Sequence, residues 1–114
     1  MREVRLEGLK MVFQGDIMIR RSRTGVPAGA RRVEGDVVAH SETGHHHVVR
    51  GGKAFATENP MLLHVVAERA EVDFLHLRDF DTHETIRLVG DPGETYDIVR
   101  QREDSPWGER MVAD

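Results

Sequence analysis

Histidine is the residue type in this chain that most suggests chemistry. Seven histidines are present among 114 residues, and four of them, His40, His45, His46 and His47, fall within eight consecutive positions. Imidazole is the most common protein ligand of transition metals at neutral pH. The local excess therefore predicts a divalent transition metal at this segment, with zinc, iron and nickel as the candidates.

The spacing within the cluster matters because residues two apart on a β-strand lie on the same face. His45 and His47 then point together, with Cα atoms about 6.5–7 Å apart, and His46 points to the opposite face. Two imidazoles placed in this way can bind one ion, with bonds of about 2.0–2.1 Å. We predict His45 and His47 as a convergent pair of metal ligands.

A metal site built on this pair needs a third and often a fourth ligand. His83 and Glu84 are the first candidates, because they lie at a polar junction where a later strand begins. His40 is the second candidate, and Glu42 would either ligate or accept the outer ring N–H of a ligand histidine. The competing interpretation is a solvated strand edge that binds nickel or zinc adventitiously.

Catalysis by side chains alone is not indicated. Cysteine is absent, and none of the three serines, Ser22, Ser41 and Ser105, lies in the setting of a hydrolase nucleophile. An enzyme built on this chain would need a metal with an open coordination position to activate water or dioxygen. Glu42 or Glu84 would then serve as the base.

The hydrophobic pattern predicts the elements that must position these residues. Period-two alternation and β-branched residues dominate, which predicts an all-β fold: a small barrel, sandwich or roll of about eight short antiparallel strands. Ile86 and Leu88 should share one face of their strand, and the apolar run at 61–66 should be a central strand. The predicted strands cover residues 17–19, 32–39, 44–50, 53–57, 61–66, 71–77, 84–89, 95–102 and 110–112.

Length and composition limit the architecture. The 114 residues fit a single β domain, 1–114, in which residues 1–10 can form an N-terminal arm. The chain is 39% hydrophobic and 32% charged, which predicts a modest core and favours a homo-oligomer. No apolar run approaches the roughly 18 residues of a membrane span, and the N-terminus lacks the apolar stretch of a signal peptide. We expect no membrane contact and a cytoplasmic or virion location.

Charge is distributed unevenly along the chain. Residues 1–32 carry eight basic and three acidic side chains, a balance of +5, whereas 33–114 carry eight basic and seventeen acidic ones, a balance of −9. The basic segment either lies on an acidic neighbour, such as another copy of the chain, or forms a solvated basic edge. Nucleic-acid binding is not expected, because this segment has one aromatic residue, Phe13, and no recognised binding motif.

Three stretches resemble a family of small proteins found in phages, prophages and bacterial mobile regions, over roughly residues 11–114. They are Thr43-Gly44-His45-His46-His47, His83-x-x-Ile86-x-Leu88, and residues 96–103 followed by Pro106-Trp107. The family pattern is Thr-Gly-His-x-His, then His-Glu-Glu-His, then Gln-Arg-Glu-Tyr. Here Phe80 replaces the first histidine of the second motif, and Asp104 replaces the tyrosine of the third. The resemblance implies that His45, His47 and His83 are the positions to watch.

These observations lead to two functional hypotheses. The first is a non-enzymatic structural accessory protein, most concretely a phage capsid cement or decoration protein that self-associates, binds a capsid or other protein shell and holds a metal through histidines. The second is a cupin-like metal-dependent enzyme, a hydrolase or dioxygenase, because cupins also place His-x-His on a barrel strand. The glutamate that cupins carry a few residues later is missing here, where Arg50-Gly51-Gly52 stands instead.

Overall fold

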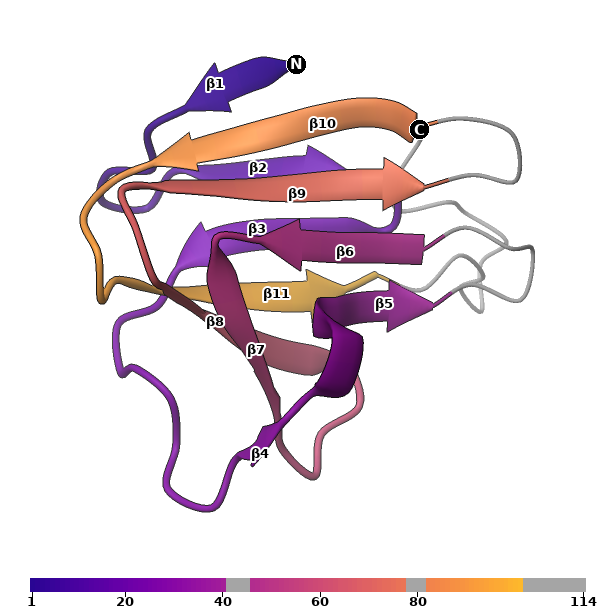
Figure 1. Ribbon diagram of the computed structural model, residues 1–114. Coiled ribbons are helices and arrows are strands. Elements are labelled where there is room, and N and C mark those ends of the chain that lie inside the picture. The colour runs from indigo at the N-terminus through magenta and orange to yellow at the C-terminus, as the bar shows by residue number, and fades with distance from the viewer. Residues whose placement is uncertain (41–45, 78–81, 102–114) are drawn as a thin grey trace.

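The computed structural model describes residues 1–40, 46–77 and 82–101, and for His40, Thr82 and His83 it describes the backbone alone. These residues form an all-β fold of two sheets, so the predicted fold class is confirmed (Figure 1). The described part contains eleven strands rather than about eight. The predicted last strand, 110–112, lies outside the described residues.

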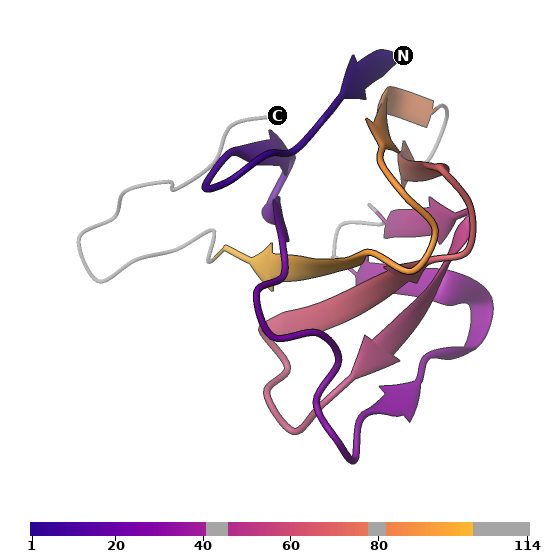
Figure 2. The same ribbon diagram turned by 90° about the vertical axis from the view of Figure 1, so that its left-hand side faces the viewer.

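Each sheet contains strands from distant parts of the chain. The first sheet has five strands, in the spatial order β1 (Arg2–Val4), β10 (Thr82–Val89), β9 (Glu71–Leu77), β6 (His46–Arg50) and β5 (Val37–His40). The second has six, in the order β2 (Met11–Gln14), β3 (Ile17–Arg21), β11 (Thr95–Arg100), β8 (Leu62–Ala67), β7 (Gly52–Ala56) and β4 (Arg31–Arg32). We call them sheet A and sheet B. They lie face to face, with β7 and β8 running obliquely across the other strands (Figures 1 and 2).

Strand direction departs from the prediction at one place. The β1–β10 pair is parallel, whereas every other pair among the described strands is antiparallel. A hairpin forces its two strands to be antiparallel, but β1 and β10 are far apart in sequence and are free of that constraint. Residues 2–4, within the segment expected to form an arm, therefore lie at the edge of sheet A.

The predicted strand 32–39 is wrong, because the chain changes sheets within it. Residues 31–32 belong to sheet B as β4, a 3₁₀ turn, η1 (Glu34–Asp36), follows, and β5 belongs to sheet A. Gly35 has φ 72° and Asp36 has φ 55°, and neither value fits an extended strand. A local alternation of apolar residues cannot reveal such a break.

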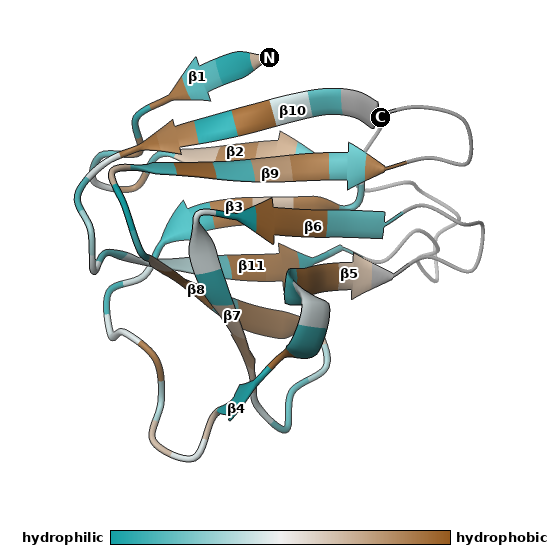
Figure 3. Cartoon of the chain, viewed as in Figure 1, coloured by the Kyte–Doolittle hydropathy of each residue, from teal (hydrophilic) through white to brown (hydrophobic). Residues whose placement is uncertain are grey.

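The core lies between the two sheets. Sheet B contributes Ile17, Ile19 and Ile98, and sheet A contributes Phe74, Ile86 and Leu88, all of them fully buried. Ile86 and Leu88 share the inner face of β10, as predicted. β8 lies between β11 and β7, which confirms residues 61–66 as a central strand. Hydrophobic segments concentrate in the strands, whereas β4 and several connections are hydrophilic (Figure 3). Among the described residues, no helix is long and apolar enough to cross a membrane.

Candidate functional site

Strand register gathers histidines at one end of sheet A. His47 on β6 lies opposite His76 on β9, and His76 lies opposite His83 on β10. His40 on β5 lies opposite His46 on β6. Five of the seven histidines therefore occupy paired positions at this end of the sheet, and His83, the predicted distant partner of His47, is two strands away from it.

His47 is buried, and chain groups contact both of its ring nitrogens. Its Nδ1 lies 3.0 Å from Oε1 of Gln14, and its Nε2 lies 2.8 Å from Oδ1 of Asp16. The amide nitrogen of Gln14 donates to the carbonyl oxygens of Phe74, at 2.7 Å, and Glu84, at 2.8 Å. With this nitrogen used in donation, the amide oxygen must accept, so His47 Nδ1 donates the proton.

Asp16 contacts the other ring nitrogen of His47. The hydrogen bond with His47 is the largest influence on Asp16 and lowers the pKa of its carboxyl group, while partial burial acts in the opposite direction. A carboxylate oxygen accepts hydrogen bonds, so this contact also occupies Nε2 of His47. His47 is thus held by an amide at one ring nitrogen and by a carboxylate at the other. While both contacts are made, neither ring nitrogen is open to a metal.

His76 packs directly against this group. The rings of His47 and His76 are stacked, with centroids 4.2 Å apart and planes inclined by 12°. His76 is buried, as expected for a core histidine. Gln14, Asp16, His47 and His76, together with the two carbonyl groups, form what we call the histidine network.

The structure describes the predicted metal ligands to different extents. His45 lies outside the described residues, as do the side chains of His40 and His83. Glu84 is exposed, and its carboxylate lies 3.8 Å from Nη1 of Arg2, so Glu84 contributes to the network through its backbone carbonyl. Among the described residues, no three metal-binding side chains form a cluster. The metal assignment to His40, His45, His47, His83 and Glu84 stays a prediction.

Gln14 and Asp16 were missed by sequence reasoning. The one available signal was alternation: Gln14 is two residues from Val12, which is buried, so it shares the inward face of β2. A glutamine on an inward face must find hydrogen-bond partners inside the protein. Those partners lie 33 to 70 residues away in the chain.

A second polar cluster, of buried His64 and Asp97 with the exposed Arg20, crosses sheet B. His64 Nδ1 lies 2.9 Å from Oδ1 of Asp97, and Arg20 Nε donates to Oδ2 of Asp97 at 3.1 Å. The three residues are paired in register on β8, β11 and β3. His64 Nε2 is buried and has no hydrogen-bond partner among the described residues. His64 is therefore a core histidine.

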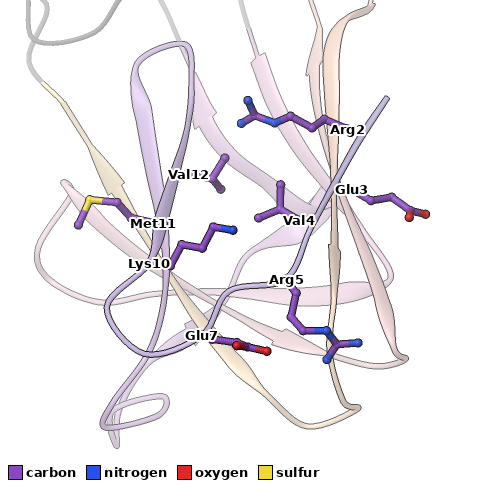
Figure 4. A pocket seen from close by; sticks show the side chains of 8 residues that line it. All are labelled: Arg2, Glu3, Val4, Arg5, Glu7, Lys10, Met11 and Val12. Atoms are coloured by element: carbon purple, nitrogen blue, oxygen red, sulfur yellow. The ribbon is translucent and has the colours of Figure 1, made fainter.

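The N-terminal edge of the sandwich consists of β1, β2 and the residues between them. An open groove of about 660 Å³ separates β1 from β2, and Lys10 and Val12 point into it while Met11 points away (Figure 4). The four exposed large hydrophobic residues of the described chain lie on β2, in the loop before it, or directly before β1. They are Met1 and Leu9, each 73% exposed, Met11, 45%, and Phe13, 44%.

The protein is thus a two-sheet β-sandwich with a buried histidine network and an edge strand, β2, that exposes Met11 and Phe13. The chain belongs to the family described as a domain of unknown function, DUF8820, whose model matches residues 13–101. This range contains every member of the histidine network and begins after Met11. No curated protein and no solved structure matches the chain.

Proposed function

We propose that this protein is a non-enzymatic structural protein that self-associates and acts on a larger protein shell, most concretely as a phage capsid cement or decoration protein. The observation that carries the proposal is that edge strand β2 exposes two large apolar side chains, Met11 and Phe13, and that exposed Leu9 lines one surface pocket together with Met11. Clustered exposed apolar residues are typical of protein interaction surfaces.

Two further features support this function. The motifs around His45 and His83 resemble those of phage and prophage proteins, which favours a location in the virion. The charge balance of +5 in residues 1–32 against −9 in the remainder favours contacts between oppositely charged parts of neighbouring copies or of a shell.

Sedimentation velocity over a wide range of protein concentrations tests the self-association. We expect a concentration-dependent species heavier than the 12.9 kDa chain. A single 12.9 kDa species at every concentration would contradict the proposal. Binding to a shell is tested by co-sedimentation with phage capsids. If all of the protein stays in the supernatant, the proposed capsid role is contradicted.

The alternative function is a cupin-like metal-dependent hydrolase or dioxygenase, which the register of His47, His76 and His83 favours. It requires His47 to give up its contact with Asp16 or Gln14. Metal content, measured on protein purified without a nickel column, distinguishes the two. An enzyme of this kind should hold zinc, iron or nickel in a stoichiometric amount that His45→Ala with His47→Ala removes. Substoichiometric metal that this double substitution leaves unchanged would exclude the specific site.

A further inference from the structure

The sheet edges of this sandwich differ in how they are protected. Edge strands are templates for pairing with another chain, and proteins usually protect them with charges, prolines, bulges or cover. β1 carries Arg2 and Glu3, and β4 consists of two arginines. β5 has an inward-packed centre, with Val38 and Ala39 buried. β2 carries neither charge nor proline, yet it exposes Met11 and Phe13.

The backbone of β2 is also open on one side. β2 pairs only with β3 and ends the strand order of sheet B. No other strand of the described chain pairs with it, and it lies at the outer margin of sheet B (Figures 1 and 2). It also borders the open groove of Figure 4. Its outward N–H and C=O groups are therefore available to an added strand.

We propose that two copies of the chain pair β2 with β2, antiparallel, about a two-fold axis at Val12. This inference rests on the self-association proposed above and identifies the contact between the two copies, which we call the β2 seam. For sheet B to continue across the axis with its faces aligned, residues of the same face must stand opposite each other. Pairing centred on Val12 satisfies this condition. It places Met11 of each copy opposite Phe13 of the other, so the axis generates two such pairs. Thioether contacts with aromatic rings are favourable.

Charge supports a second copy as the occupant. In this register Lys10 stands opposite Gln14 of the second copy and diagonal to Asp16, an acidic neighbour within reach of a long side chain. No like charges oppose each other along β2. Pairing β4 with β4 would instead bring arginines together, which is unfavourable.

A single cysteine tests the axis, because the chain contains no other. Directly opposed residues of an antiparallel pair have Cα atoms about 4.5–5.5 Å apart, which falls within the disulfide range of about 4.4–6.8 Å. Under mild oxidation, Val12→Cys should form a covalent dimer. Lys10→Cys is the matched control: its side chain is more exposed, but its Cα would lie about 13 Å from its equivalent. It should stay uncrosslinked.

Substitutions on the exposed face provide an independent test. Met11→Lys and Phe13→Lys change side chains that are about half exposed, so folding, checked by circular dichroism, should persist. Self-association should weaken about tenfold or more, whereas Glu3→Lys on β1 should leave it unchanged. If the dimer is as stable in both lysine variants as in the wild type, and Val12→Cys stays uncrosslinked, the β2 seam is overturned while self-association stands. A monomeric wild type would overturn both proposals.

Discussion

Gln14 is the residue that joins the two sheets around His47. It belongs to sheet B, and its side chain bonds to groups on β9, β10 and β6 of sheet A. Few side chains can make this set of bonds, because it requires two donors and one acceptor in a single planar group. The buried histidine depends on this residue as much as on Asp16.

Removing the amide should therefore destabilise the fold. Gln14→Leu keeps most of the volume but leaves two carbonyl groups and His47 Nδ1 without their partner. Each buried unsatisfied group costs about 1–3 kcal/mol, so with three such groups we expect the free energy of unfolding, measured in urea, to fall by at least about 3 kcal/mol. Glu58→Leu, at an exposed turn, should change it by less than about 0.5 kcal/mol. Equal effects of the two substitutions would contradict the assigned role.

Acid should weaken the same network through Asp16. The pKa of Asp16 is lowered from 3.8 by its hydrogen bond with His47, so its stabilising effect is complete above the unfolded-state pKa and is lost as the pH falls through the lower folded-state value. The stability difference between wild type and Asp16→Asn should be constant near pH 5 to 6 and shrink towards pH 2.5. Arg87 also lowers the pKa of Asp73, but Asp73 is present in both proteins, so its contribution to the pH dependence cancels in the difference. A difference independent of pH would contradict this role of Asp16.

At the scale of elements, connections decide where the strands lie. Gly51 joins β6 of sheet A to β7 of sheet B with φ 87°. The bulge between His83 and Ile86 gives Glu84 a φ of 48° at the point where its carbonyl accepts from Gln14. Both backbone conformations are uncommon for residues with a side chain, and the one at Glu84 supplies a carbonyl group to the network around His47.

Gly51→Ala should be far more damaging than a substitution at a similar glycine. A Cβ at Gly51 would lie 2.6 Å from the carbonyl oxygen of Glu71, whereas a Cβ at Gly93, which has φ 91°, would meet nothing within 4 Å. Gly93→Ala should thus cost only the conformational term of about 1–2 kcal/mol. Gly51→Ala adds the clash and should lower the thermal midpoint clearly further. Equal midpoints for the two variants would show that the close approach is unimportant.

At the scale of the whole molecule, the unequal edges separate two ways of self-association. A basic N-terminal segment on the acidic body of a neighbour would be held mainly by charge, whereas β2 pairing buries apolar side chains and backbone groups. Salt screens exposed charges, with a Debye length of about 8 Å at 0.15 M and about 3 Å at 1 M.

Self-association should therefore change little with ionic strength. We expect the dissociation constant, measured by sedimentation equilibrium, to vary less than about threefold between low salt and 0.5 M salt, because screening acts on the charges and not on apolar contacts. Strong weakening by salt, with Arg23→Glu equally damaging, would instead indicate contact through the basic segment.

The sequence was sufficient to predict the all-β class, the inward face of β10 and the strand position of His47. Each follows from a period of two, which is a local property of the backbone. It did not reveal the break at Gly35 and Asp36, the parallel β1–β10 pair, or Gln14 and Asp16 as the partners of His47. Those features depend on which strands become neighbours and in which register, and only the packing of the two sheets decides that.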